Sequence, residues 1–156
     1  MTSAIMKIYL RKANFSDIEF LWYLRNQADV YKYSRQSRTI NWKEHISWIM
    51  PIILGLSNKE LFIIENSKIP IGQVRCDYKN HKEVKVSISL LKEFWGKGFA
   101  TRSLKSIIKQ IKKQGKVQRL IAEVNKNNIT SQKLFEKLNF KLKGQKGQWL
   151  KYIFNT

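Results

Sequence analysis

Residues 86–101 read VSISLLKEFWGKGFAT, and this stretch decides the fold. Val86, Ile88 and Leu90 alternate with polar serines, which predicts a strand with one strongly apolar face. Two glycines follow, one residue apart, and the pattern then becomes helical. A strand that runs through a glycine turn into a helix offers unpaired amides and the positive end of the helix dipole to an approaching phosphate.

The two glycines, Gly96 and Gly98, leave two interpretations open. Glycine tolerates positive φ and lets a ligand touch the backbone, but Gly-x-Gly also occurs in ordinary strand-to-helix turns. The turn is not a P-loop, because no Gly-Lys-Ser/Thr follows at the right spacing. It does not fit a dinucleotide fingerprint either, because Thr101 stands where the third glycine should be. The turn therefore either binds phosphate in another way or is purely structural.

A second strand–turn–helix unit lies about thirty residues further on. Residues 120–124, LIAEV, predict a short apolar strand that contains Glu123. Residues 125–128 form a turn and helix-cap cluster, and the next eleven-residue pattern, TSQKLFEKLNF, predicts a helix. A carboxylate inside an apolar strand is aimed either at a site or at an exposed strand end, and Asn128 is either a simple helix cap or a ligand contact.

Together the two units resemble the GNAT superfamily of N-acetyltransferases. The acetyl-CoA motif of that family, Gln/Arg-x-x-Gly-x-Gly/Ala, is matched by Glu93-Phe-Trp-Gly96-Lys-Gly98 except at its first position. The later family motif is matched by Asn128-Ile-Thr-Ser131 and by residues 134–140, LFEKLNF. The resemblance covers nearly the whole chain. It implies one α+β domain at residues 1–156, a GNAT fold with a mixed, mostly antiparallel twisted sheet of about seven strands and about four flanking helices.

The resemblance implies transfer of an acetyl group from acetyl-CoA to a primary amine. The backbone of the glycine turn would hold the pyrophosphate, and residues 90 and 91 would present backbone to the pantetheine arm and polarise the thioester carbonyl. Glu123 would be the general base, acting directly or through water. The cofactor contacts that follow are Leu90, Leu91, Trp95, Gly96, Lys97, Gly98, Phe99, Ala100, Thr101, Asn128, Ser131 and Phe135.

The acid step is left open by the resemblance. Many members of the family protonate the departing thiolate with a tyrosine, but the matching position here is Phe135, which has no proton to give. Either another donor serves, or the thiolate leaves unassisted and is protonated by solvent.

The N-terminal third is expected to select the acceptor. Its segments 24–26, 35–38 and 45–48 resemble a GNAT branch that acetylates amino groups of nucleotide-linked sugars, with the pseudaminic-acid-pathway enzymes the nearest to it. The resemblance implies that a phosphate and a ribose or diphosphate are bound by Arg25 and His45, and that Tyr33 and Trp48 wall the sugar. Each also has a structural interpretation: Arg25 as a helix C-terminal cation, His45 as a surface or capping residue, and Trp48 as core.

The net charge of the chain indicates which kinds of molecule it can bind. The chain has 30 Lys and Arg residues against 11 Asp and Glu, a formal charge of +19. Such a field speeds the capture of CoA or of a nucleotide-linked substrate. Binding of nucleic acid is the alternative, but the lysines are spread throughout, so we expect no nucleic-acid partner. Two further functions stay open: acetylation of a protein N-terminus, such as that of a ribosomal protein, and a GNAT domain that binds CoA or RNA without turnover.

The remaining features predict a cytoplasmic protein of one domain. A single cysteine, Cys76, excludes an internal disulfide and is expected to serve packing. No apolar run approaches a membrane span, and two histidines with one cysteine predict no metal site. A closing hairpin at residues 141–154 would leave an exposed edge, so a homodimer is an open possibility.

Periodicity predicts the other elements. Ser16-Asp-Ile-Glu19 resembles a capping box that opens a helix to about residue 26. A second such start at Asn41-Trp-Lys-Glu44 opens a helix that Pro51 should kink or split. The strands expected from alternation are residues 6–12, 61–65, 71–78, 86–91, 120–124, 141–145 and 148–154.

Overall fold

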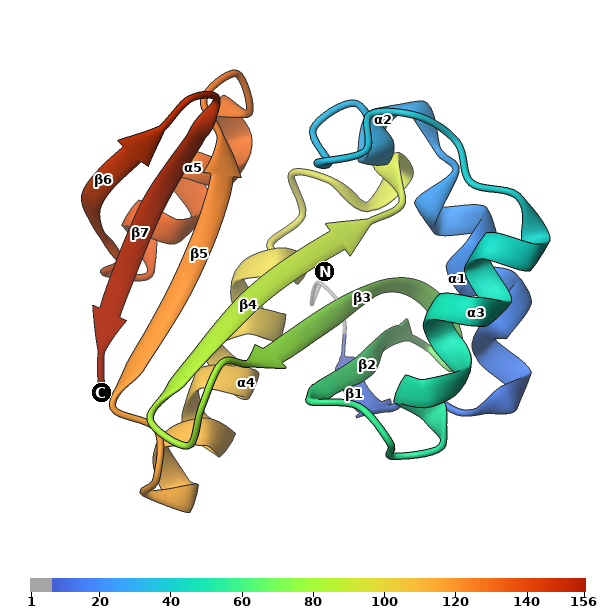
Figure 1. The fold of residues 1–156 in the computed structure, drawn as a ribbon, viewed down its shortest axis with the longest axis horizontal. Coiled ribbons are helices and arrows are strands. Elements are labelled where there is room, and N and C mark those ends of the chain that lie inside the picture. Colours follow the sequence, from blue (N-terminus) through green and yellow to red (C-terminus); the bar gives the residue numbers. More distant parts are fainter. Residues whose placement is uncertain (1–6) are drawn as a thin grey trace, which may run out of the picture.

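A computed structural model describes residues 7–156 of the chain. Seven strands form one sheet in the order β1-β2-β3-β4-β5-β7-β6, and every neighbouring pair is antiparallel except β4 and β5 (Figure 1). This confirms the predicted α+β class and the mixed, mostly antiparallel sheet. The first strand was predicted from Met6, which lies outside the described residues. The strands are β1 Ile8–Lys12, β2 Lys59–Asn66, β3 Ile69–Tyr78, β4 Glu83–Leu90, β5 Arg119–Asn125, β6 Lys141–Lys146 and β7 Trp149–Asn155.

Within residues 7–156, five α-helices accompany the sheet, one more than the approximate prediction. The additional helix is the single turn α2, which is too short to produce a helical period in the sequence. The helices are α1 Ile18–Arg25, α2 Ala28–Tyr31, α3 Trp42–Ile53, α4 Phe99–Gln114 and α5 Ile129–Lys137. Two short 3-10 turns, Phe15–Asp17 and Lys92–Phe94, precede α1 and the glycine turn.

The sheet has a different partner on each face. The buried stripe of α4 packs in the larger core with the interior of β3 and β4, whereas α1 and α3 form a second core against the other face of β2. Strand β2 shows the division directly, because its neighbours Ile63 and Ile64 belong to opposite cores. Figure 1 shows α4 behind the strands and the α1–α3 pair beside β2 and β3. Successive side chains of a strand point to opposite faces of the sheet, so β2 contributes residues to both cores.

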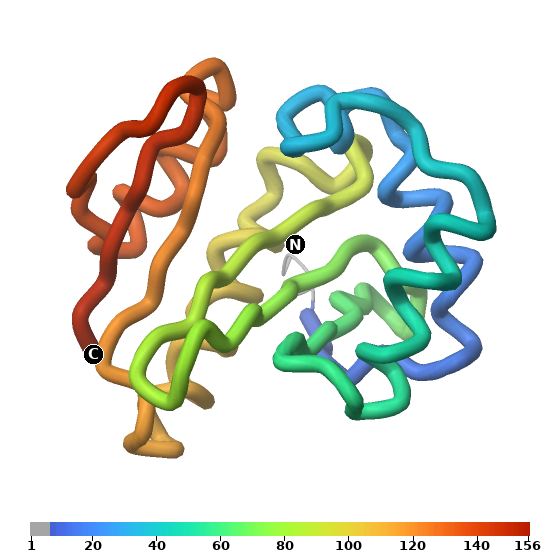
Figure 2. The backbone as a smooth tube through the Cα atoms, in the orientation of Figure 1, coloured from blue at the N-terminus to red at the C-terminus, as the bar shows by residue number. Residues whose placement is uncertain are grey.

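Strands β4 and β5 run parallel but pair only at their beginnings. Residues 83–85 pair with residues 119–121, and no further pairing between the two strands follows in the described chain. Strand β5 instead pairs along its whole length with β7. The backbone trace shows the two halves of the sheet diverging from that short contact (Figure 2). Past Lys85, one edge of β4 is therefore left open, and the two clefts described below lie along it.

Two predicted helix starts had different outcomes. Asn41 and Glu44 form the capping box that was predicted, with 2.9 Å bonds in both directions. The earlier box was placed wrongly: Asn14 and Asp17 form it, because the first turn is a 3-10 turn that begins two residues before α1 was expected to start. Pro51 neither splits nor ends α3, since it lies in the last turn of a helix that continues to Ile53.

Cys76 is fully buried in β3 with its thiol free. Burial raises the pKa of that thiol to about 12, so it is protonated at neutral pH and unsuited to nucleophilic attack. This confirms the packing role. Among residues 7–156, no helix combines the length and apolar character that a membrane crossing requires.

Candidate active site

The glycine turn presents a helix N-terminus whose amides have no partner within the helix. Gly96 and Gly98 both have positive φ, +72° and +81°, a region that L side chains rarely adopt. Gly98 is the N-cap of α4, and the first intrahelical bond runs from the Arg102 amide to its carbonyl at 3.1 Å. No side chain caps this end. The amides of residues 99–101 are thus free to bind a phosphate oxygen.

These amides face a cleft of about 650 Å³ that we call the CoA cleft. It runs between the end of β4, the glycine turn and α5. Nine of the twelve residues predicted to contact the cofactor line it. The predicted residues that line it are Leu90, Trp95, Gly96, Gly98, Phe99, Ala100, Thr101, Asn128 and Ser131.

The three predicted residues outside this lining are Leu91, Lys97 and Phe135. Lys97 is exposed, and its Nζ lies 5.9 Å from the Phe94 ring centroid. Phe135 lines the adjacent cleft instead. The role predicted for the backbone of Leu91 is wrong, because its amide donates to the Ile71 carbonyl at 2.9 Å and so faces β3.

The direction of the backbone amides along β4 shows that the Leu90 amide lies on the open edge of the strand. Successive backbone amides of a strand point to opposite sides, and the Leu91 amide points to β3. The Leu90 amide therefore points toward the diverging β5 half, where an extended chain such as pantetheine can bond to it. The Leu90 carbonyl, on the same edge, already accepts a 3.0 Å bond from Trp95 Nε1. That bond ties the glycine turn to the strand.

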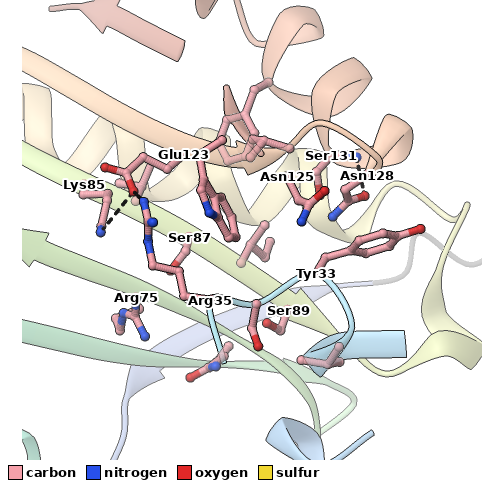
Figure 3. A pocket seen from close by; sticks show the side chains of 18 of the residues that line it. Tyr33, Arg35, Arg75, Lys85, Ser87, Ser89, Glu123, Asn125, Asn128 and Ser131 are labelled. Atoms are coloured by element: carbon pink, nitrogen blue, oxygen red, sulfur yellow. Dashed lines mark hydrogen bonds and ion pairs between the residues drawn. The ribbon is translucent and has the colours of Figure 1, made fainter. Parts of the chain in front are cut away.

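A second, smaller cleft of about 360 Å³ opens beside the first, and we call it the acceptor cleft (Figure 3). Polar side chains from β3, β4, β5 and the segment after α2 point into it. The predicted residues Arg25, Tyr33, Glu123, Asn128, Ser131 and Phe135 line it. Several others were missed in the sequence: Arg35, Gln73, Arg75, Lys85, Ser87, Ser89, Asn125 and Trp149. Alternating polar residues in β3 and β4 were the available signal, but they are indistinguishable from a solvent-facing strand surface.

Glu123 lies on β5 with two cations beside its carboxylate. Arg35 donates a hydrogen bond to it, and the Nζ of Lys85 lies 3.6 Å from its Oε2 (Figure 3). Burial pushes the pKa of Glu123 upward, but the Arg35 hydrogen bond and the charge of Lys85 outweigh burial, so its pKa lies below the ordinary value. The carboxylate is therefore ionised at neutral pH, as a proton acceptor must be.

Asn128 and Ser131 begin α5 between the two clefts. The Asn128 side chain accepts a 3.2 Å bond from the Ser131 amide, so the capping role is confirmed. Both residues line both clefts. Contact with the CoA arm remains a prediction. Phe135, one turn further on, is buried and packs edge-on against Phe140 at 5.1 Å. The ring supplies an apolar wall and no proton.

Arg25 ends α1 and holds the next segment in place. Its two terminal nitrogens donate to the carbonyls of Gln36 and Arg38 at 2.9 and 3.1 Å. Burial, followed by repulsion from Arg38 and Arg75, lowers its pKa, yet an arginine remains charged at neutral pH. Arg25 thus has a structural role in addition to any contact with a phosphate, and that contact remains a prediction.

The nucleotide contact predicted for His45 is wrong. The side chain is 1% exposed in the interface between α1 and α3, and its Nε2 lies 2.8 Å from the Ile18 carbonyl. Burial lowers its pKa, so it is neutral at physiological pH. The residue does lie on α3, near the predicted site, but its side chain faces α1 and not a cleft.

Trp48, one turn further along α3 than His45, is half-buried and serves two environments. It packs against the second core and also lines a third cleft, between α1 and α3. The Cζ of Arg75 lies 5.7 Å from its ring centroid there. A sugar-wall role remains a prediction. Tyr33 lines both the CoA cleft and the acceptor cleft, so it lies on the border between them. Among the described residues, no three His, Cys, Asp or Glu side chains gather as metal ligands.

Comparison with known proteins identifies the class. The family described as "Acetyltransferase (GNAT) domain" matches residues 7–141. The chain therefore belongs to the GNAT acetyltransferases, as the two sequence motifs predicted. Membership makes it an N-acetyltransferase domain with acetyl-CoA as cosubstrate, in agreement with a cleft that ends on a free helix N-terminus.

Individual proteins resemble the chain over nearly its whole length. An uncharacterized protein of Methanocaldococcus jannaschii is 33% identical over 153 residues, which is 92% of this chain and 30% of that protein's length. The crystal structure of a domain from the same organism has a TM-score of 0.87 at 28% identity, covering 97% of this chain and 99% of that one. Spermidine N-acetyltransferase from Vibrio cholerae, solved with CoA and spermine, has a TM-score of 0.84 at 19% identity and 95% coverage of both chains. This last likeness concerns the fold alone.

Proposed function

We propose that this domain acetylates the primary amine of an acceptor that also carries phosphate, and that the acceptor is a nucleotide-linked amino sugar. The observation that supports this is the charge of the acceptor cleft. Four cations line it, Arg25, Arg35, Arg75 and Lys85, and among the described lining residues Glu123 is the only acid. Arginine and lysine bind phosphate oxygens strongly. The single carboxylate of Glu123 is sufficient to bind and deprotonate one amine.

Three groups would perform the chemistry. Glu123 accepts a proton from the acceptor ammonium, which leaves a neutral nitrogen to attack the thioester carbonyl carbon. The Leu90 amide donates to the oxygen that becomes negative in the tetrahedral transition state. The C–S bond then breaks, Tyr33 gives its phenolic proton to the departing sulfur, and the extra proton on the new amide nitrogen passes to the phenolate and restores the phenol. We assign the acid role to Tyr33 because it lines both clefts, whereas Phe135 carries no acidic proton.

Two other acceptors fit the cleft less well. A polyamine such as the one bound by the spermidine enzyme carries several positive charges, which four lining cations would repel. A protein N-terminus needs an open groove, and an acidic peptide would be the version best suited to this charge. Both are included in the test as alternative acceptors: spermidine tests the charge of the cleft, and the peptide tests whether the cleft is an open groove.

The test follows thiol release from acetyl-CoA with matched acceptors. The panel contains nucleotide-linked amino sugars, the same amino sugars without nucleotide, spermidine and an acidic peptide with a free N-terminus. We expect turnover with the nucleotide-linked sugars. Substituting Arg75→Gln should raise their KM about tenfold through the lost charged hydrogen bond, with the Kd for acetyl-CoA unchanged.

Arg119→Gln is the matched control, because Arg119 pairs with Glu83 at the far end of β5 and lies outside the cleft lining. It removes the same charge from the protein. Equal turnover of the free and nucleotide-linked sugars, or equal effects of the two substitutions, would refute the phosphate-bearing acceptor. Faster turnover of spermidine or of the peptide would identify that compound's class as the acceptor instead.

A further inference from the structure

The side chain of Arg35 contacts the β5–β7 half of the sheet. It belongs to the segment between α2 and α3, where its side chain is 60% exposed. Its guanidinium donates to Glu123 on β5, and its Cζ lies 4.4 Å from the ring centroid of Trp149 on β7. Figure 3 shows Arg35 extending toward Glu123 across the acceptor cleft. The Arg35 side chain therefore lies between the Glu123 carboxylate and the open part of the acceptor cleft.

The two groups that hold Arg35 are suited to any organic cation. A carboxylate accepts charge-assisted hydrogen bonds, and the face of a tryptophan attracts a cation within about 6 Å of its centroid. An acceptor amine enters the cleft as an ammonium ion, because alkylamines are protonated at neutral pH. Among the described lining residues it finds one carboxylate, Glu123, and Arg35 is already bonded to it.

We propose that Glu123 and Trp149 form the ammonium subsite for the acceptor, and that Arg35 occupies this subsite until the acceptor displaces it. The inference rests on the proposed role of Glu123 as the base. The arriving ammonium replaces the guanidinium on the carboxylate and on the ring. One N–H proton then passes to a carboxylate oxygen, which gives a carboxylic acid and a neutral amine. The freed lone pair of that nitrogen forms the new C–N bond.

Competition with Arg35 makes this subsite selective. A simple amine has only the Glu123 and Trp149 contacts with which to displace the guanidinium. An acceptor that also carries phosphate gains further contacts with Arg25, Arg75 and Lys85, which stay in the cleft. Displacement of an exposed ion pair is a small cost, so the second type of acceptor overcomes it readily. Arg35 thus acts as a specificity-determining residue against amines that lack an anionic group.

Kinetics with an amino sugar that carries no nucleotide test the competition. Arg35→Gln should lower its KM about fivefold, because the cation that is hydrogen-bonded to Glu123 is gone and only Lys85, 3.6 Å from the carboxylate, remains beside it. Trp149→Leu should raise its KM about fivefold, because the ring is part of the subsite, and Trp149→Phe, which keeps an aromatic face, should recover most of that loss. The Kd for acetyl-CoA should not change in any of these variants.

Arg38→Gln is the matched control from the same segment, since Arg38 pairs with Glu44 rather than Glu123. It should leave the KM unchanged. If Arg35 only holds its segment in place, Arg35→Gln and Trp149→Leu will raise KM together. That result would overturn the proposal.

A second measurement needs no turnover and so separates this proposal from the proposed function. The carboxyl carbon of Glu123 is followed by NMR during titration with n-butylammonium chloride, with sodium chloride as the control. We expect a shift specific to butylammonium that grows in Arg35→Gln and shrinks in Trp149→Leu. If no sugar is acetylated but this pattern appears, the proposed acceptor fails and the subsite stands. A response identical to that of sodium chloride in every variant would refute the subsite.

Discussion

At the scale of the residue, opposing effects decide which groups can carry the chemistry. Burial alone would raise the pKa of Glu123, but the neighbouring Arg35 and Lys85 keep the carboxylate ionised. Phe135 occupies the position from which the family resemblance predicted a proton donor, and its buried ring has none to give. Tyr33 lies on the border of the two clefts and carries a phenol. The proposed base, Glu123, and the proposed acid, Tyr33, therefore come from segments 90 residues apart in the chain.

Substitution of Tyr33 by Phe should lower kcat about 100-fold if its phenol protonates the departing thiolate. The KM for the acceptor should change little, because the ring remains in place. Stopped-flow or steady-state thiol release measures both constants. Tyr31→Phe, two residues away at the end of α2, is the control for loss of a hydroxyl. A kcat equal to that of the unsubstituted protein would show that the thiolate leaves without Tyr33.

At the scale of the element, close contact between β3 and β4 positions the strand edge that lines the CoA cleft. Gly72 of β3 pairs with Leu90 of β4, next to the bond from the Leu91 amide to Ile71. A Cβ at Gly72 would lie far inside contact distance of the Ser89 carbonyl and of the Leu90 side chain. Glycine at this position allows the two backbones to approach where β4 reaches the cleft. The geometry of the Leu90 amide thus depends on a residue of the neighbouring strand.

Replacement of Gly72 by Ala should therefore affect both stability and cofactor binding. We expect a loss of about 1–3 kcal/mol in the free energy of unfolding from overpacking, measured by denaturant titration. Isothermal titration of the folded variant should give a weaker Kd for acetyl-CoA. Gly144→Ala is the control, because Gly144 lies in β6 with ordinary φ and nothing within 4 Å of its Cβ position. Equal stability of the two variants would contradict the close-contact argument.

At the scale of the whole molecule, a few acids hold together a strongly basic chain. The net charge of +19 opposes the compact state by self-repulsion. Arg11 joins three segments by bonding Asp17 in the turn before α1 and Glu65 in β2. Asp17 is 2% exposed. Burial would raise the pKa of Asp17, but the Arg11 hydrogen bonds and the Asn14 amide outweigh it and lower that pKa.

This cluster predicts acid sensitivity with a definite sign. The pKa of Asp17 in the folded protein lies below its ordinary value of 3.8, so the unfolded state binds the proton first as pH falls. The contribution of Asp17 to stability is complete well above pH 3.8 and is lost as pH falls through the folded-state pKa. At neutral pH, Asp17→Asn should cost about 3 kcal/mol, because it breaks a buried ion pair.

Denaturant titrations of both proteins from pH 7 down to acid conditions measure this effect. The difference in unfolding free energy between the two proteins should shrink as pH falls below 3.8, since protonation makes the native Asp17 resemble the variant. Other carboxylates titrate in both proteins and cancel in the difference. A difference that stays constant with pH would mean that Asp17 is not the titrating group.

The sequence by itself determined the parts of this protein that depend on local rules. Alternation and helical periodicity are short-range consequences of backbone geometry, so the seven strands and the long helices were predicted with ends that differ by a few residues. The glycine turn and its helix were likewise predicted, because positive φ and free N-terminal amides are properties of a few consecutive residues. One-turn elements such as α2 were missed, since four residues are too few to establish a period.

Only the tertiary structure decided what faces the clefts. The inward rotation of α3 buries His45 and leaves Trp48 partly free, and a sequence pattern does not tell which neighbour covers a helix face. The divergence of β4 from β5 turns alternating polar residues on β4 into a cleft wall rather than a solvent surface. Arg35 meets Glu123, which lies 88 positions further along the sequence. Contacts of that kind follow from how strands are ordered in the sheet, which residue spacing alone does not record.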